Sequence, residues 1–131
     1  MTLIEFPLNK IPNQPPENYY GNKEYKIYLE FKDKKINNIL EKKATQMLFR
    51  IHEGKGIAKY IVGIKDNGEA IGINRSKLYS SLINLNKIVN IIDADLKKLR
   101  FYKGSNGFIF VAHVFRNIDN FDLSLNWIKL S

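Results

Sequence analysis

Residues 61–73 read IVGIKDNGEAIGI, and this stretch decides between a nucleotide-binding fold and a simpler one. Its three glycines, Gly63, Gly68 and Gly72, lie between short apolar runs, as in a loop that holds phosphate. A dinucleotide fingerprint needs the spacing Gly-x-Gly-x-x-Gly between a strand and a helix. Here the glycines are five and four residues apart, and the Asp-Asn-Gly in the middle is typical of a hairpin, because Asn-Gly tolerates a positive φ. We therefore predict two strands joined by a turn, over residues 57–64 and 69–73.

The segments on either side show helix and strand periods. Residues 23–31 alternate apolar and polar side chains, which indicates a half-buried strand. Apolar residues three or four apart predict amphipathic helices over residues 36–54 and 74–93, the first ended by Gly54 and the second capped by Asn74 or Ser76. Residues 94–104 and 105–115 form a predicted closing strand pair. The predicted fold is α+β, with two helices on a mixed sheet in the order β-α-β-β-α-β-β.

The N-terminal segment has a different character. All four prolines lie in residues 1–16, and each one lacks an N–H donor and restricts the residue before it. We therefore interpret residues 1–20 as an extended proline-rich arm and residues 21–131 as a single α+β domain. Tyr19 and Tyr20, at the end of the arm, either pack against the domain or stack on bases, and packing is the favoured interpretation.

Composition limits the class of protein. The chain has 131 residues, of which 44% are apolar, which suits one domain with a real core. It has no apolar run of about 18 residues and no signal-peptide pattern at its N-terminus, so we expect a cytoplasmic protein with no membrane partner. The absence of cysteine excludes disulfides, thiolate metal sites and a cysteine nucleophile.

The net charge is +8, which favours a polyanionic partner such as RNA, DNA or an anionic membrane. Lysine outnumbers arginine, which suits contacts to phosphate better than bidentate contacts to bases. A competing interpretation is that the charge is incidental, since Lys, Asn and Ile are all abundant, as AT-rich genomes produce.

Basic and aromatic residues supply the candidate RNA contacts. Some lie on the polar face of the first predicted helix, and others are interleaved with Phe101 and Tyr102 in the closing strand pair. Such a string can hold a nucleic-acid backbone and stack a base, or it can be a strand whose polar face is solvated. The candidates are Tyr19, Tyr20, Lys42, Lys43, Arg50, Lys97, Lys98, Arg100 and Lys103.

Catalytic patterns are missing from the sequence. His52 and His113 are the only histidines, and neither has a carboxylate in a recognised metal-ligand spacing, so a structural role is favoured for both. The motifs Gly-x-Ser-x-Gly and His-Glu-x-x-His do not occur. We expect a non-enzymatic protein with no metal and no cofactor.

Five motifs follow one another in the first half of the chain: Pro-Pro-Glu, Gly-Asn-x-Glu-Tyr-Lys, Thr-Gln-Met, Arg-x-x-Glu-Gly and Gly-Ile-x-Asp-x-Gly. They lie at residues 15–17, 21–26, 45–47, 50–54 and 63–68. In order and spacing they resemble the N-terminal region of the eukaryotic GTP-binding-protein family of translational GTPases, over residues 15–73. The resemblance implies an accessory domain of such a GTPase.

In that family the GTPase domain follows, with a phosphate loop of the form Gly-Asn-Val-Asp-x-Gly-Lys-Ser. Asn117–Asp119 fits the middle of this motif, but Arg116 and Phe121 stand in place of the glycines and Asp122 in place of the lysine. The loop needs glycine for close approach of backbone N–H groups and lysine to neutralise the phosphate. We therefore expect no GTP binding and no working GTPase domain.

The resemblance implies a ribosome-binding factor that contacts rRNA and ribosomal proteins. Without GTP hydrolysis it would occupy a tRNA or factor site between the subunits and hold ribosomes inactive, as in dormancy or hibernation. The Lys-, Asn- and Ile-rich composition fits a reduced genome, such as that of a microsporidian.

Two alternatives stay open. The Glu-Tyr-Lys strand, the helix and the Gly-Ile-Lys-Asp-Asn-Gly hairpin also resemble, more distantly, the Schlafen and AlbA-type divergent domain, some members of which cut RNA with three carboxylates. Glu24 and Asp66 match two of these, but the third falls near Tyr19, which is not acidic. A metal-dependent RNA endonuclease is therefore one alternative, and a protein-interaction module with incidental charge is the other.

Overall fold

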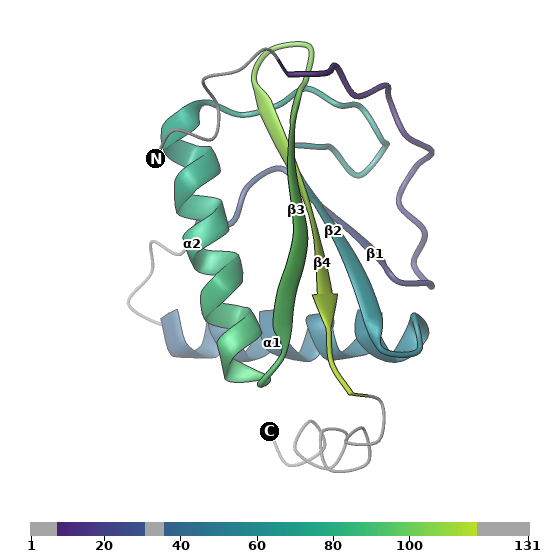
Figure 1. The fold of residues 1–131 in the computed structure, drawn as a ribbon, viewed down its shortest axis with the longest axis vertical. Helices are drawn as coiled ribbons and strands as arrows, with labels where there is room; N and C mark the ends of the chain where they lie inside the picture. Colours follow the sequence, from purple (N-terminus) through teal and green to yellow (C-terminus); the bar gives the residue numbers. More distant parts are fainter. Residues whose placement is uncertain (1–7, 31–35, 118–131) are drawn as a thin grey trace.

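The computed structural model describes residues 8–30 and 36–117, which form two helices and one sheet (Figure 1). The sheet has the strand order β1-β2-β4-β3; β1 runs parallel to β2, and the other pairs are antiparallel. The predicted α+β class, with two helices and a mixed sheet, is confirmed. In chain order the elements are β1 (Lys23–Lys26), α1 (Ile36–Glu53), β2 (Ile57–Val62), α2 (Arg75–Ile91), β3 (Asp95–Lys103) and β4 (Phe108–Phe115).

The predicted strand over residues 69–73 is wrong, so the observed order is β-α-β-α-β-β. The chain does turn as expected: the Gly68 N–H donates to the Lys65 carbonyl at 2.9 Å, although the positive φ falls on Gly68 and not on Asn67. Beyond the turn only Ile73 forms a bridge, to Phe108. The carbonyls before it accept hydrogen bonds from the β3–β4 turn instead of from a strand. The first strand is also shorter than predicted, because β1 ends at Lys26.

Both helices cover the same face of the sheet and form the main core with it. Met47 and Ile51 of α1 and Leu85 of α2 are fully buried there against Tyr60 and Phe110 of the sheet. Burying a large apolar side chain contributes about 1.5–3 kcal/mol, so this layer supplies much of the stability. Asn74 caps the N-terminus of α2: its side chain accepts the Lys77 N–H at 2.8 Å, and it is one of the two caps that the sequence predicts.

Within the part of the chain that the structure describes, the opposite face of the sheet is covered only in part. A smaller core forms there from Tyr25 of β1, Ile61 of β2 and Val111 of β4, with Ala70 from the loop after β2 and Ile11 from the arm packed on it. In Figure 1 the arm, in purple, lies on the side of the sheet away from α2. Beyond this core, the face carries Lys59 and His113 and, at its end, the apolar pair Ile57 and Phe115.

Residues 8–20 of the arm run in an extended path over the domain. Backbone hydrogen bonds hold them: Ile11 donates to the Lys103 carbonyl at 3.1 Å, and Glu17 donates to that of Asp66 at 2.7 Å. Tyr19 and Tyr20 contact each other edge to face, with ring centres 5.2 Å apart. Their exposed fractions are 79% and 65%, so the favoured interpretation, that they anchor the arm by packing, is wrong.

Candidate nucleic-acid interface

A line of basic side chains crosses the open face of the sheet. The strand register pairs Lys23 with Lys59, Lys59 with His113, and His113 with Lys97, one residue from each strand. Laterally paired side chains point to the same face of a sheet. Tyr25 and Ile61, two positions after Lys23 and Lys59, and Val111, two positions before His113, lie in the smaller core, so these four side chains share its face.

Strand β3 adds two more cations. Arg100 pairs with Val111 on the same face, and Lys98 lies in a β-bulge between Lys97 and Arg100, with a φ of 53°. A bulge twists a strand and re-aims a side chain. The Lys98 ammonium lies 5.9 Å from the centre of the Phe115 ring. The Lys97 ammonium lies 5.7 Å from the same ring centre. We call this set the basic row: Lys23, Lys59, Lys97, Lys98, Arg100 and His113.

The members of the basic row repel one another. Burial lowers the pKa of Lys59, and the charge on Lys23 lowers it further. Burial also lowers the pKa of His113, with smaller contributions from Lys59, Lys98 and Arg100. The Nδ1 atom of His113 is buried and has no hydrogen-bond partner among the described residues. A bound anion would relieve this repulsion, so the row is suited to phosphate groups.

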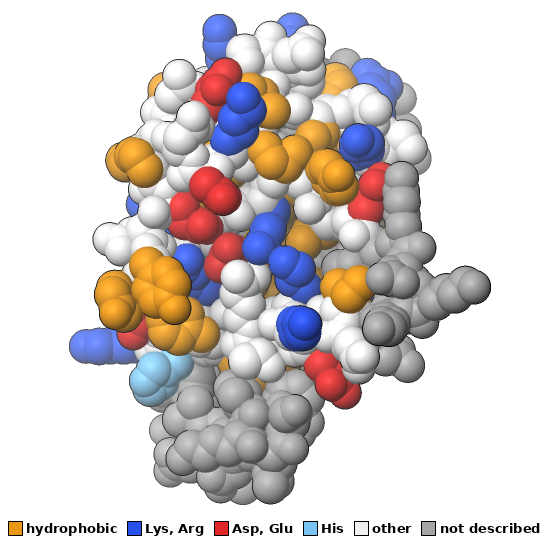
Figure 2. Space-filling model, turned by 180° about the vertical axis from the view of Figure 1, so that it is seen from behind, with side chains coloured by type: hydrophobic (Ala, Val, Ile, Leu, Met, Phe, Trp, Pro, Cys, Tyr) orange, Lys and Arg blue, Asp and Glu red, His pale blue; other side chains and the backbone are white. Residues whose placement is uncertain are grey.

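The charge distribution elsewhere is mixed. On the face shown in Figure 2, Lys and Arg side chains are interspersed with Asp and Glu side chains. Surface ion pairs of this kind, such as Lys65 with Glu69 at 3.3 Å, contribute little to stability or binding. Strand register is therefore a better guide to a polyanion site here than net charge.

Three of the candidates from the sequence, Lys97, Lys98 and Arg100, lie in the basic row. Lys103 lies at the far end of β3, where its backbone pairs with the arm. Lys42 is exposed on α1, which packs on the other face of the sheet. Sequence reasoning missed Lys23, Lys59 and His113. They become neighbours only through strand pairing, which no local pattern reveals.

The expectation that Arg50 lies on an exposed basic face is wrong. Arg50 is 4% exposed, and its Nε donates to Glu24 Oε1 at 2.9 Å. Its two Nη atoms donate to the carbonyls of Asn18, Tyr19 and Gly21. The arm folds back over this part of α1, so a residue on the helix's polar face becomes buried.

Lys43 is half-buried close to this ion pair. Burial, with a further contribution from the neighbouring Lys26, lowers the pKa of Lys43 to about 8. Lys26 itself pairs with the second oxygen of Glu24 at 3.4 Å. Lys43 therefore belongs to a buried charge network at β1, away from the basic row.

The endonuclease alternative needs Glu24 and Asp66 in an open metal site, and the structure does not place them in one. Both oxygens of Glu24 face cations, from Arg50 and Lys26. The backbone carbonyl of Asp66 accepts a hydrogen bond from the Glu17 N–H. Within residues 8–30 and 36–117, no three His, Asp or Glu side chains come together in a group that could hold a metal ion.

No protein-family model matches the chain. Over 95 residues the chain is 36% identical to GTP-binding protein 2 of Mus musculus, and equally to that of Homo sapiens. The chain carries a domain related to this GTP-binding protein. The match covers 70% of the chain but only 15% of each relative. The predicted resemblance is thus confirmed at the level of a GTPase-related domain.

Of the segment that was compared with a phosphate loop, the structure describes only Arg116 and Asn117. The Arg116 Nε donates to the Ile92 carbonyl at 2.7 Å, which fixes the end of β4 against the end of α2. The rest of that comparison, residues 118–122, lies outside the described residues, so the absence of GTP binding stays a prediction. No helix within residues 8–30 and 36–117 is long and apolar enough to cross a membrane.

Proposed function

We propose that this protein is a non-enzymatic, cytoplasmic ribosome-binding factor that contacts rRNA through the basic row. The observation that carries the proposal is the alignment of Lys23, Lys59, His113 and Lys97 across four strands. Strands in a sheet are about 4.8 Å apart, so the line spans about 14 Å, enough to follow a stretch of RNA backbone. The flexible, compact charges of lysine suit phosphate contacts in which sequence is not read.

The relationship to a GTP-binding protein supports a place on the ribosome. The family that the chain resembles consists of translational GTPases. An accessory domain of such a GTPase would dock on the ribosome through the basic row. A protein with this docking surface and no GTP hydrolysis would stay bound in a tRNA or factor site between the subunits. Long occupancy of such a site holds ribosomes inactive, which is the behaviour of a dormancy or hibernation factor.

The test is sedimentation of cell lysate through sucrose gradients at low and high salt. We expect the wild-type chain to travel with whole ribosomes at low salt and not with polysomes. A Lys59→Ala, Lys97→Ala double variant should move to the top of the gradient. The matched control removes two lysines outside the row, Lys65→Ala and Lys87→Ala, and should sediment as wild type. A chain that stays at the top at every salt, or equal loss in both variants, would contradict the proposal.

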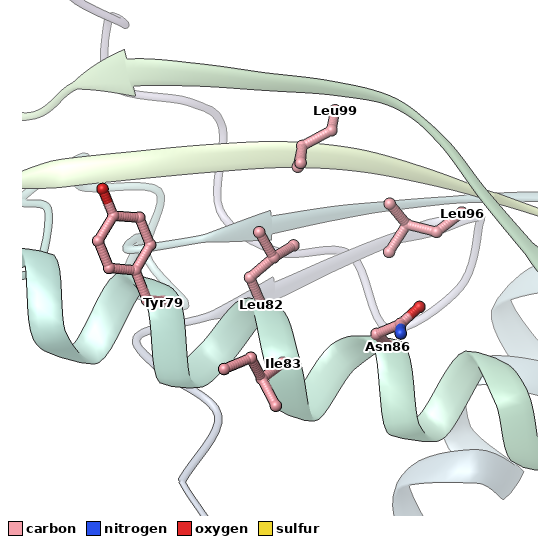
Figure 3. Close-up of a pocket in the computed structure, with 6 residues that line it drawn as sticks. All are labelled: Tyr79, Leu82, Ile83, Asn86, Leu96 and Leu99. Carbon is pink, nitrogen blue, oxygen red and sulfur yellow. The ribbon is translucent and has the colours of Figure 1, made fainter. Parts of the chain in front are cut away.

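An apolar groove between α2 and β3 favours a second candidate, the protein-interaction module. The groove has a volume of about 280 Å³, and Figure 3 shows Leu96 and Leu99 of β3 near Tyr79 and Leu82 of α2. Ile83 is 58% exposed beside it. A partner bound there would be held by apolar contact, so its binding would be nearly independent of salt. The two-salt gradient therefore separates the candidates.

A further inference from the structure

A second hollow, distinct from the groove, lies where the arm crosses the edge of β1 beside α1. Its volume is about 360 Å³, within the range of about 300–1,000 Å³ that is usual for ligand sites. Polar and aromatic side chains line it together: Glu17 and Tyr19 of the arm, Glu24 of β1, and Gln46, Phe49 and Arg50 of α1. Tyr19 and Phe49 are 79% and 38% exposed, so the hollow has accessible aromatic residues.

Two acceptor groups that line this hollow have capacity for a ligand's donors. The Oε1 atom of Gln46 is buried and has no partner among the described residues. Glu17 uses its Oε2 both to accept the Tyr25 N–H at 2.6 Å and to approach Arg50 at 3.8 Å. A carboxylate has about four lone-pair positions, so Glu17 retains capacity for further donors. Burial raises the pKa of Glu17, and the nearby Glu24 raises it further, which a ligand with N–H donors would offset.

The charges around the hollow disfavour a cation. Glu24 is held by Arg50 at 2.9 Å and by Lys26 at 3.4 Å, and Lys43 lies next to Lys26. Two carboxylates, Glu17 and Glu24, thus already face three basic groups. An ammonium, a guanidinium or a metal ion would meet repulsion, whereas a neutral ligand with N–H donors would not.

A neutral, planar ligand with two adjacent donors fits this chemistry, and guanine is the RNA base that has them. Its N1–H and N2–H₂ groups lie side by side and match the two oxygens of a carboxylate. Adenine and cytosine place an acceptor beside their amino group, and uracil has one N–H between two carbonyls. Unpaired bases in RNA are commonly stacked on aromatic side chains and bound along this edge.

We infer that the hollow binds an unpaired guanine of RNA, with the base against Tyr19 and Phe49 and its donor edge on Glu17 and Gln46. The inference rests on the proposed contact with rRNA and adds a base preference to it. Lys23 of the basic row directly precedes Glu24, so the two sites lie on opposite faces of β1 at the same edge of the sheet. An RNA strand that follows the row would have to pass around this edge to reach the hollow.

The test measures binding of the full chain to labelled RNA pentamers by fluorescence anisotropy. The probes are UUGUU, UUAUU and the inosine analogue UUIUU, which lacks the N2 amino group. A bidentate base contact discriminates by about 1–3 kcal/mol, so we expect UUGUU to bind at least about fivefold more tightly than UUAUU, with UUIUU in between. Glu17→Gln keeps an acceptor for Tyr25 and should abolish the preference. Lys59→Ala should weaken all three probes equally.

A readout on the wild-type chain guards against variants that fail to fold. The side-chain amide resonance of Gln46 should shift in NMR spectra on adding UUGUU and stay in place with UUAUU. Equal affinity for the three probes, or a preference that survives both Glu17→Gln and Phe49→Ala, overturns the guanine site and leaves rRNA contact standing. No binding of any probe overturns both the inference and the proposed function.

Discussion

Arg50 on α1 and Glu24 on β1 form a buried ion pair, with Arg50 Nε 2.9 Å from Glu24 Oε1 and the side chains 5% and 3% exposed. Removing one partner of such a pair leaves an uncompensated charge, which costs about 3–5 kcal/mol. We therefore expect Arg50→Ala to lower the free energy of unfolding by about that amount, as measured by urea denaturation. Lys65→Ala breaks an exposed pair and should cost at most about 1 kcal/mol. Similar losses of unfolding free energy in the two variants would show that the buried pair contributes no more to stability than the exposed one.

Two glycines with nearly equal φ provide a matched test of how the arm is held. Gly68 and Gly21 have φ of 93° and 92°, so alanine is strained at both by about 1 kcal/mol. At Gly68 the new Cβ would also lie 1.8 Å from the Gln14 carbonyl oxygen, whereas at Gly21 nothing lies within 4 Å. Gly68→Ala should therefore release the arm and expose it to limited proteolysis, and Gly21→Ala should not. Equal cleavage of both variants would contradict this account.

These contacts explain which features could be predicted from sequence. The apolar stripes of both helices and the two candidate caps, Asn74 and Ser76, are local features, and the structure confirms the stripes and the first of the two caps. Residues 69–73 do not form a strand, because the β3–β4 turn takes their hydrogen bonds. Arg50 is buried because a segment about thirty residues earlier covers it. The basic row depends on register between four strands, and no sequence pattern indicates which lysines will be opposite one another.

Lys43 should make stability depend on alkaline pH. Its pKa is lowered to about 8 in the folded state, from the ordinary lysine value of 10.5. Between these values the unfolded chain binds more protons than the folded one, so stability rises with pH from about 8 to about 10.5. Because Lys43 is only half-buried, solvent screening limits the gain to about 1–2 kcal/mol. Lys43→Met should remove this rise in urea denaturation measured across that range. If Lys43→Met shows the same rise in stability, another titratable group causes it.

His113 should make RNA affinity depend on mildly acidic pH. Burial, Lys59, Lys98 and Arg100 lower its pKa in the free protein, and a bound phosphate would raise it. RNA binding would then be coupled to proton uptake, so affinity should increase as the pH falls through 7 toward 6. His113→Gln should flatten this dependence in anisotropy titrations of an RNA oligonucleotide. A wild-type affinity that is constant over this interval would mean that no phosphate approaches His113.

The salt dependence of RNA binding should report how many cations of the basic row contact phosphate. For single strands, the logarithm of affinity falls with the logarithm of salt concentration with a slope of about −0.7 for each phosphate contacted. Lys59→Ala should therefore make the slope shallower by about 0.7, and Lys59→Ala with Lys97→Ala by about twice that. Lys87→Ala, on the exposed surface of α2, is the matched control and should leave the slope unchanged. If the slope changes as much for Lys87 as for Lys59, the RNA senses the total charge of the protein and not the row.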